Sequence, residues 1–349
     1  MSQLQDHLPS HVQWADDQGH QTPDLFSSFA EEYTALQEGA ALLDLSHNGL
    51  ITVSGEERVS FLSGLITNEI NRVSNTQTIH TAMLTAQGRF IWDYTILSLD
   101  DSLMVVTEPD RLEMLVNQFR FYLLRTKAEI SLNTNYALLG VAGPKATEIL
   151  TKLHPEMNLA DAPLGQVFSH DKVRVWKDPR HETFGWRILL PVDQLTELWD
   201  KLSHVITPVG LQAWTHYRAV NGLPRGAVDL PPNGCLPLEA GYLELNSVDF
   251  KKGCFIGQET TARTHHRGTI KKRLFKITFT EGTAPDSGTD ILVDEEKQAG
   301  TLTTVSCQKG QCVGMALLRV SDVASGKPLT AGGHPLTATK PDWAEWDVV

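Results

Sequence analysis

The strongest constraint on the fold of this chain is a weak internal repeat. The segment 53–56 (VSGE) follows a strand-like run and opens a helical run of apolar residues, and 88 residues later the segment 141–144 (VAGP) does the same. Two or three strand-like runs follow each helix, and then a second helix, for which Asp110 and Asp193 are the expected N-caps. Each copy therefore predicts strand, helix, two or three strands, helix and strand, which is the ferredoxin-like arrangement of an α+β fold.

The C-terminal third predicts different elements. A helix over 211–221 should end at Gly222-Leu223-Pro224, because Gly followed by Pro is a helix stop signal. From residue 273 on, short strand-like runs alternate with Gly, Asp and Ser turns, which predicts a small β-barrel or sandwich. The expected domains are one ferredoxin-like lobe from 1–136 with 207–270, a second from 137–206, and a barrel over 271–349.

The charge of the chain is unevenly distributed. Lys and Arg number 30 against 42 Asp and Glu, a net charge of −12, which argues against a surface that binds nucleic acid or anionic membrane as a whole. The segment 250–276 nevertheless carries +7, with Arg267 among its eight cations, so the remaining residues carry −19. This basic segment is either a localised anion site or a solvated basic strand and turn, and charge alone does not separate the two.

The cysteines and the N-terminus indicate a cellular setting. Four cysteines in 349 residues are too few for a disulfide framework, so we expect reduced thiols, with Cys307 and Cys312 structural residues of a hairpin around 309–310. Residues 1–20 lack an apolar core of signal-peptide length, and they contain acidic residues and no arginine. With no run of 18 apolar residues either, we expect a cytoplasmic protein without a membrane span.

One segment concentrates residues suited to chemistry. The chain has no G-x-S-x-G, no phosphate-binding G-x-x-x-x-G-K-[ST], no H-E-x-x-H and no C-x-x-C, which disfavours hydrolases, kinases and self-contained zinc sites. Cys254 follows two lysines and lies between Gly253 and Gly257, a setting that favours a thiolate nucleophile or metal ligand. Gln258 and Glu259 offer a carboxamide and a carboxylate to a heterocycle. The alternative is a free cysteine that acts as a small buried hydrophobe.

These residues carry a family resemblance. Residues 252–259 (KGCFIGQE) resemble the K-G-C-[FY]-x-G-Q-E signature of the YgfZ-type family, folate-binding relatives of the glycine-cleavage T protein that act in iron-sulfur cluster maturation. The continuation 261–266 is most similar to the branch with the mitochondrial iron-sulfur assembly factor. Further matching pieces are 67–69, 87–89, 178–180, 185–187, 222–224 and 229–232.

The resemblance implies a fold and a ligand. The fold is a three-lobed ring around a central channel, with two ferredoxin-like lobes and one β-barrel. The ligand is a tetrahydrofolate in that channel, whose carboxylate tail would account for the basic segment. The resemblance implies catalytic roles for Cys254 and Asp93, and it implies folate contacts for Asn68, Lys252, Gly253, Gly257, Gln258, Glu259 and Arg263.

Two departures from the T protein bear on the activity. Its pterin-binding glutamate aligns with Val220, and its Asp-Asp pair aligns with Trp92-Asp93. Both departures disfavour aminomethyl transfer. The leading hypothesis is therefore a non-catalytic or weakly catalytic factor that helps to assemble [4Fe-4S] clusters with A-type carrier proteins for client iron-sulfur enzymes.

In this hypothesis Cys254 is a ligand of a cluster shared with a partner, because clusters normally take four protein ligands. The alternative is a folate-dependent one-carbon transferase or demethylase, with Asp93 as general base and Gln258 and Glu259 positioning the substrate. RNA binding is disfavoured because the basic segment lacks an interleaved aromatic platform.

Overall fold

A computed structural model of the chain describes residues 2–268 and 270–348, without the side chains of Ala227 and Arg267. The charge of Arg267, counted above in the basic segment, therefore lies outside the described residues. The chain forms two compact units. Unit 1 comprises Met1–Ala82, Asp93–Trp214 and Lys251–Phe255, and unit 2 comprises Met83–Trp92, Thr215–Phe250 and Ile256–Val349.

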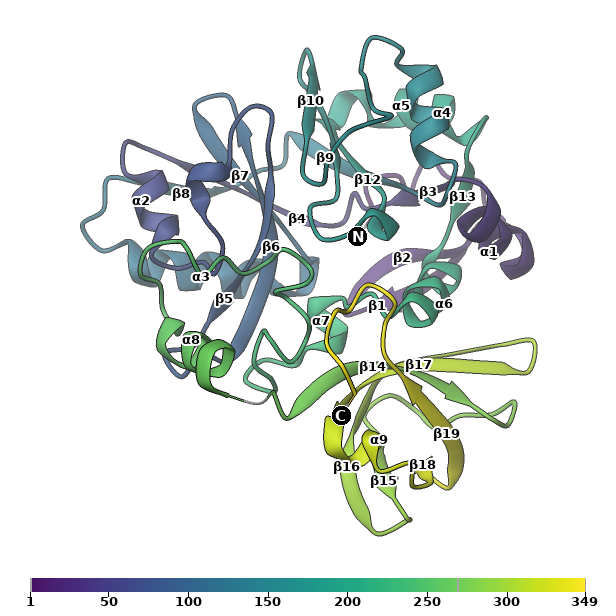
Figure 1. Cartoon of the computed structure of the whole chain (residues 1–349). Helices are drawn as coiled ribbons and strands as arrows, with labels where there is room; N and C mark the ends of the chain where they lie inside the picture. Colours follow the sequence, from purple (N-terminus) through teal and green to yellow (C-terminus); the bar gives the residue numbers. More distant parts are fainter. Residues whose placement is uncertain (1, 269, 349) are drawn as a thin grey trace. The chain divides into compact units, whose positions relative to one another are not determined.

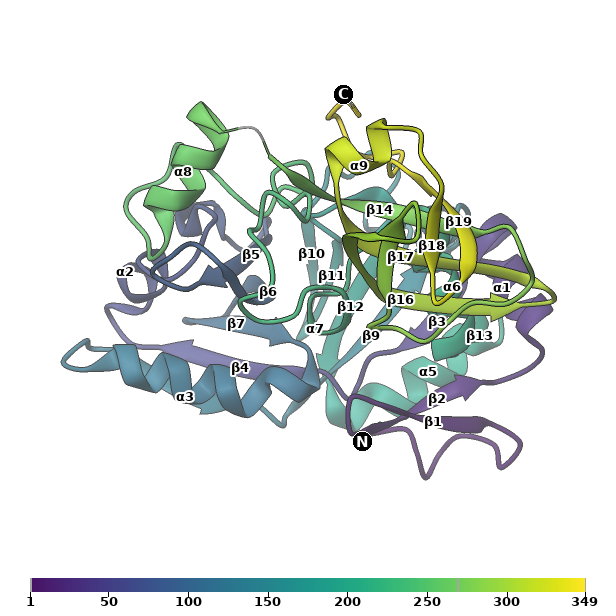
Figure 2. The ribbon, with the colours of Figure 1, turned by 90° about the horizontal axis from the view of Figure 1, so that it is seen from below.

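The first copy of the repeat forms a five-stranded sheet with strand order β5-β6-β7-β4-β8. Its helix α3 runs along the sheet beside β4 (Figure 2). In chain order the elements of this copy are β4 (Gly49–Ser54), α2 (Arg58–Ser63), β5 (Ile79–Leu84), β6 (Phe90–Leu99), β7 (Ser102–Thr107), α3 (Leu112–Leu123) and β8 (Glu129–Leu132). The predicted succession of strand, helix, three strands, helix and strand is confirmed.

The second copy forms a six-stranded sheet with strand order β10-β11-β12-β9-β3-β13. Its elements are β9 (Tyr136–Ala142), α4 (Ala146–Leu153), β10 (Val167–His170), β11 (Val173–Lys177), β12 (Trp186–Pro191), α5 (Leu195–Ser203) and β13 (Thr207–Val209), joined by the earlier strand β3 (Ala41–Asp44). The same succession of elements recurs, so the ferredoxin-like α+β class is confirmed.

The strand β3 distinguishes the two sheets. In the first sheet β8 pairs directly with β4, whereas in the second β3 lies between β9 and β13, antiparallel to β9 and parallel to β13. The expected domain limits assigned both β3 and β13 to the first lobe, but their hydrogen bonds belong to the second sheet. All four residues of β3 are buried, and a run this short gives no periodicity from which to predict its partner.

The glycines of the two repeat motifs have the same backbone role. Gly55 has φ +96° and Gly143 has φ +99°, in the region that favours glycine. A Cβ on Gly55 would lie 2.5 Å from the Lys127 carbonyl oxygen, and one on Gly143 would lie 2.7 Å from that of Gly39. The repeat therefore preserves a tight strand-to-helix turn packed against a neighbouring backbone.

The expected N-caps of the second helices are wrong. Asp110 lies inside the 3₁₀ turn Pro109–Arg111 before α3, and Asp193 lies inside the 3₁₀ turn Val192–Gln194 before α5. Neither α3 nor α5 has a side-chain cap. A 3₁₀ turn at a helix start moves the N-cap position beyond the aspartate that the sequence pattern indicated.

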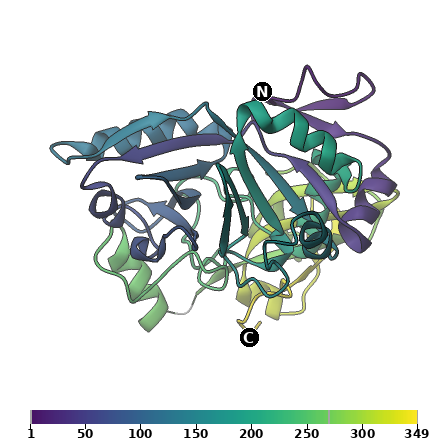
Figure 3. The same ribbon diagram turned by 90° about the horizontal axis from the view of Figure 1, so that it is seen from above.

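The N-terminal segment packs in unit 1. It forms β1 (Gln13–Asp17), β2 (His20–Leu25) and α1 (Phe29–Glu38), and its Leu4 and Val12 share a core with Leu195, Trp199 and Leu202 of α5. The His7 ring pairs with Asp200 of α5. Figure 3 shows the N-terminal end of the chain close to the teal helix α5. No helix in the described parts of the chain is long and apolar enough to cross a membrane.

Unit 2 contains the predicted barrel, which is confirmed as a closed sheet with strand order β14-β17-β16-β15-β18-β19 (Figure 1). Its strands and following helix are β14 (Lys272–Phe279), β15 (Asp290–Val293), β16 (Lys297–Gln308), β17 (Gln311–Arg319), α9 (Val320–Ala324), β18 (Leu329–Ala331) and β19 (His334–Thr339). The remaining helices are α6 (Leu211–Asn221), as predicted, α7 (Gly226–Asp229) and α8 (Gln258–Arg267).

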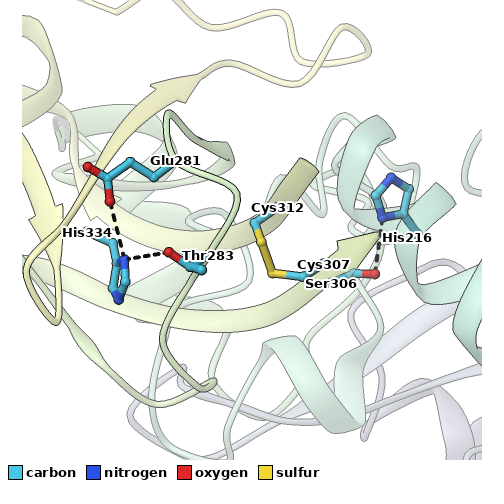
Figure 4. Close-up of a disulfide and its surroundings, with 7 residues drawn as sticks. All are labelled: His216, Glu281, Thr283, Ser306, Cys307, Cys312 and His334. Carbon is cyan, nitrogen blue, oxygen red and sulfur yellow. Dashed lines mark hydrogen bonds and ion pairs between the residues drawn. A yellow bond between two sulfur atoms is a disulfide. The ribbon is translucent and has the colours of Figure 1, made fainter. Parts of the chain in front are cut away.

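Cys307 and Cys312 form a disulfide across the β16–β17 hairpin, with a Cα–Cα distance of 4.1 Å (Figure 4). The expectation of reduced thiols is wrong for this pair. The two residues occupy directly opposed positions of the hairpin, and that register brings their sulfur atoms together. The adjacent Ser306 hydroxyl lies 3.1 Å from Nδ1 of His216 in α6.

Candidate functional site

The signature loop of unit 1, residues 251–255, is fastened by its second lysine. Lys252 Nζ donates hydrogen bonds to the carbonyl oxygens of Ser63, the last residue of α2, at 2.7 Å, and of Ile66, in the segment after α2, at 2.6 Å. The same ammonium lies 4.7 Å from the centre of the Phe255 ring. Lys252 therefore ties the loop to the end of α2, and its expected folate contact stays a prediction.

Cys254 is the exposed thiol of this loop. Of the two free cysteines, Cys254 is exposed and Cys235 is buried. A Cβ placed on the neighbouring Gly253 would meet nothing within 4 Å, so the backbone beside the thiol is open. This arrangement differs from the alternative of a small buried hydrophobe, because the thiol is exposed at the surface.

The rest of the signature belongs to helix α8 of unit 2. Gly257, with φ +85°, is its N-cap residue, and Gln258 is its first helical residue. Glu259 pairs with Arg263 at 2.5 Å on the exposed face of the helix, with side chains 82% and 68% exposed. The two side chains form an exposed ion pair, and their expected folate contacts stay predictions.

Asn68 and Asp93 meet at a buried histidine in unit 1. Asn68 donates through its side-chain amide to the His80 carbonyl oxygen at 2.8 Å, and the His80 ring Nε2 lies 3.3 Å from Asp93 Oδ2. His80 and Asp93 lie on strands β5 and β6, and their side chains are 4% and 9% exposed. His80 was not among the predicted site residues, although a histidine within the mostly apolar run 79–84 is a detectable signal.

A buried ion cluster lies in the electrostatic surroundings of His80. Asp178 Oδ2 lies 2.8 Å from Arg180 Nη2 and 3.3 Å from Arg187 Nη2, and the Arg180 guanidinium stacks 3.7 Å from the centre of the Phe184 ring. Burial alone would raise the pKa of Asp178, but the two arginines hold that pKa well below its usual range. We call Asn68, His80, Asp93, Asp178, Arg180 and Arg187 the polar cluster.

The polar cluster fixes the protonation of His80. Burial lowers the pKa of His80, and the nearby Arg180 lowers it further, against the opposing effect of Asp93. A neutral imidazole donates its Nε2 proton to the Asp93 carboxylate and so orients it. Such a histidine-aspartate pair can hold a carboxylate in place as a base, which is the role expected of Asp93.

The matching pieces at 222–224 and 229–232 are structural. The Asp229 carboxylate of α7 accepts hydrogen bonds from Arg218 Nη1 and the Arg225 backbone N–H, and from the hydroxyls of Thr303 and Thr304 on β16. Asp229 is fully buried and Arg218 nearly so. This carboxylate joins α6 and α7 to the barrel within unit 2.

Two positions where the chain departs from the T protein are apolar in their setting. Val220 is half-buried on α6. Trp92 is 5% exposed, and its indole N–H has no hydrogen-bond partner within the described residues. The described residues also contain no group of three or more His, Cys, Asp or Glu side chains that could hold a metal ion.

Comparison with known proteins gives this geometry a family. The model of the GCVT N-terminal domain matches residues 4–243, and that of the CAF17 C-terminal β-barrel domain matches 271–346. The aminomethyltransferase T of the glycine cleavage system from Bartonella henselae has the same fold, with a TM-score of 0.83, 18% identity and coverage of 98% of this chain and 96% of that one. Fold and signature loop thus define a GCVT-type protein with a CAF17-type barrel.

Within that class, the chain belongs to the family of the iron-sulfur cluster assembly factors named IBA57. The mouse mitochondrial protein of that name is 30% identical, covering 86% of this chain and 84% of its own, and the human one is 28% identical over 88% and 86%. A mitochondrial homolog from Neurospora crassa is 33% identical over 76% of this chain, which spans only 60% of that relative's length.

The expectation of a cytoplasmic protein is corrected by these relatives. All three are named as mitochondrial proteins. The expectation depended on residues 1–20 and on the missing apolar run, and neither feature separates the cytoplasm from the mitochondrial interior for a globular chain.

Proposed function

We propose that this chain takes part in the assembly of iron-sulfur clusters and that Cys254 supplies one ligand to a cluster in transit. The proposal is supported by family membership and by one structural observation, the exposed thiol on a loop that Lys252 anchors at two carbonyl oxygens. A fastened loop presents the sulfur in a defined position, which lowers the entropy cost of forming a shared bond.

The cluster is cargo that the chain shares with a partner. A cluster takes four protein ligands, usually thiolates, and the described residues offer one exposed free cysteine with no group of three metal-ligating side chains. The remaining ligands must then come from a second protein. An A-type carrier that delivers the cluster, and client enzymes that receive it, are the partners that this function requires.

Anaerobic mixing of the chain with a cluster-loaded A-type carrier tests the proposal. The expected result is a stable complex whose visible absorbance is lost with Cys254→Ala and kept with Cys235→Ala. Cys235 is the matched control because it is the other cysteine outside the disulfide and it is buried. A complex with unchanged absorbance in Cys254→Ala would remove the thiol from the mechanism.

A second proposal, tetrahydrofolate binding, draws support from the GCVT domain match and from the His80–Asp93 pair. The fit of the expected residues is partial, because Lys252 is held by carbonyl oxygens and Glu259 pairs with Arg263. When bound, the folate would supply the one-carbon carrier, and Asp93 would act as the base beside it.

Calorimetric titration with tetrahydrofolate, followed by incubation with an amine donor, tests this second proposal. Heat of binding that is lost in Asp93→Asn, together with methylene-tetrahydrofolate formation, is the expected result for a transferase. Binding without turnover would leave a folate site on an assembly factor, and no binding would reject both.

A further inference from the structure

Unit 2 has a large cavity outside the signature loop and the polar cluster. Its volume is about 1040 Å³, at the upper end of the range for ligand sites. The wall comes from the turn before β6, the segment 234–239, the first turn and the C-cap of α8, the start of β14, the end of β17, the start of α9 and the C-terminal segment. Five cationic side chains line it: Arg89, Lys271, Lys272, Arg273 and Arg319.

Two of these cations are opposed on neighbouring strands. Lys272 of β14 and Arg319 of β17 are direct partners in the antiparallel register, so their side chains share one face. Like charges in opposed positions destabilise a sheet unless an anion lies between them. Lys272 is the first residue of β14 and Arg319 is the last residue of β17, where Arg319 also donates to the Gln298 carbonyl oxygen.

The carboxylates of the wall do not neutralise these cations. The cavity has two acidic residues: Glu239, whose Oε2 accepts from the Leu236 N–H at 2.8 Å, and the exposed Asp347. Within residues 2–268 and 270–348, no carboxylate pairs with Arg89, Lys271 or Lys272.

The other two cations have distinct partners. Arg273 pairs with Glu244 at 3.2 Å and lies over the Trp346 ring, 5.2 Å from its centre. Arg319 lies 3.8 Å from Asp322. The unpaired positive charge of the cavity is therefore concentrated on Arg89, Lys271 and Lys272.

We infer that this cavity binds a compact polyanion, a small ligand with two or more phosphate or carboxylate groups. Arg89, Lys271 and Lys272 would hold the charges, and Gln87, Thr260 and Ser321 in the same wall would add neutral hydrogen-bond donors. The inference does not depend on Cys254 or on iron-sulfur chemistry. Of the two alternatives for the basic segment, an anion site or a solvated strand and turn, the inference favours the anion site.

Titration calorimetry on the full chain at low salt, with inorganic tripolyphosphate in one arm and citrate in the other, tests the inference. We expect at least one anion to bind, with affinity that falls as salt is added. The double variant Lys271→Gln/Lys272→Gln should bind about tenfold or more weakly, because it removes two charge-assisted contacts. The arm with tighter binding identifies phosphate or carboxylate as the recognised group.

The matched control is Lys309→Gln/Lys327→Gln, which removes two exposed charges of the same barrel outside the cavity. This control should bind as the original chain does, and both variants should keep its circular dichroism spectrum. Absence of binding in both arms, or equal weakening by the control pair, would overturn the inference. Loss of anion binding with intact cluster transfer would separate this site from the proposed function.

Discussion

At the scale of single residues, the polar and charged side chains of this chain fall into two groups. Lys252 and Asp229 are structural, since each is satisfied by several partners that belong to different segments. Cys254 and the cavity lysines lack such partners within the described parts and face outward or into a cavity. The distinction matters within the signature 252–259, where Lys252 is held by backbone carbonyl oxygens and Cys254 is exposed.

Replacing Asp229 with asparagine should strongly destabilise unit 2. The substitution leaves the buried Arg218 without its counter-charge, and breaking a buried pair in this way costs about 3–5 kcal/mol. Urea unfolding measures the loss. Asp342→Asn is the control, because its pair with Lys276 is at the surface and should contribute little. Equal losses of unfolding free energy for the two substitutions would show that the Asp229 carboxylate does not hold α6 and α7 to the barrel.

The buried His80 should make stability depend on pH. Burial lowers its pKa in the folded chain, whereas in the unfolded chain it titrates near about 6.5. Its contribution to stability is therefore present above pH about 6.5 and is lost as the pH falls toward the folded value, because the unfolded chain then binds the extra proton.

Urea unfolding between pH 5 and 8 measures this dependence. His80→Gln should lower the slope of the unfolding free energy against pH by an amount equivalent to at most one bound proton. His11→Gln, at an exposed position, should keep the original slope. An unchanged slope in His80→Gln would mean that the folded and unfolded chains protonate this imidazole alike, which would contradict the lowered pKa.

At the scale of elements, the sequence predicted those with long periodic patterns. The helices of the paired repeat and α6 show apolar residues at helical spacing, and most barrel strands lie between clear turn residues. It missed β3 and β18, of four and three residues, because such short runs carry no period. It also missed α8, whose sequence QETTARTHHR is too polar for an apolar stripe.

The same reasoning explains which parts of the site were predictable. Motif spacing identified Cys254 and the polar residues around it, because those residues are contiguous in sequence. The pairings of His80 with Asp93 and of Lys252 with two carbonyl oxygens join distant segments, and only the fold shows them. The disulfide likewise required the hairpin register.

The start of α8 depends on Gly257. Its φ of +85° alone would cost an alanine about 1–2 kcal/mol, and an added Cβ would lie 2.6 Å from the Thr85 carbonyl oxygen. Gly257→Ala should therefore lower the thermal midpoint, and Gly253→Ala, where a Cβ meets nothing within 4 Å, should leave it almost unchanged. Equal midpoints for the two variants would contradict the assigned turn.

At the scale of the whole molecule, the chain combines a GCVT-type domain with a CAF17-type barrel. Its net charge of −12 conceals a basic segment of +7 that supplies both the flanks of Cys254 and three cations of the unit 2 cavity. The basic segment 250–276 is therefore divided between the two compact units. We propose that unit 1 presents the cluster ligand and that unit 2 binds a separate anion.

The proposal that Cys254 is a shared cluster ligand is tested most directly by native mass spectrometry of the chain mixed anaerobically with a cluster-loaded A-type carrier. We expect a complex whose mass includes the iron and sulfide of a cluster. The Cys254→Ala variant should lose that added mass, and the Cys235→Ala variant should retain it. A cluster-containing complex of the same abundance with Cys254→Ala would contradict the claim that this thiol is a shared ligand.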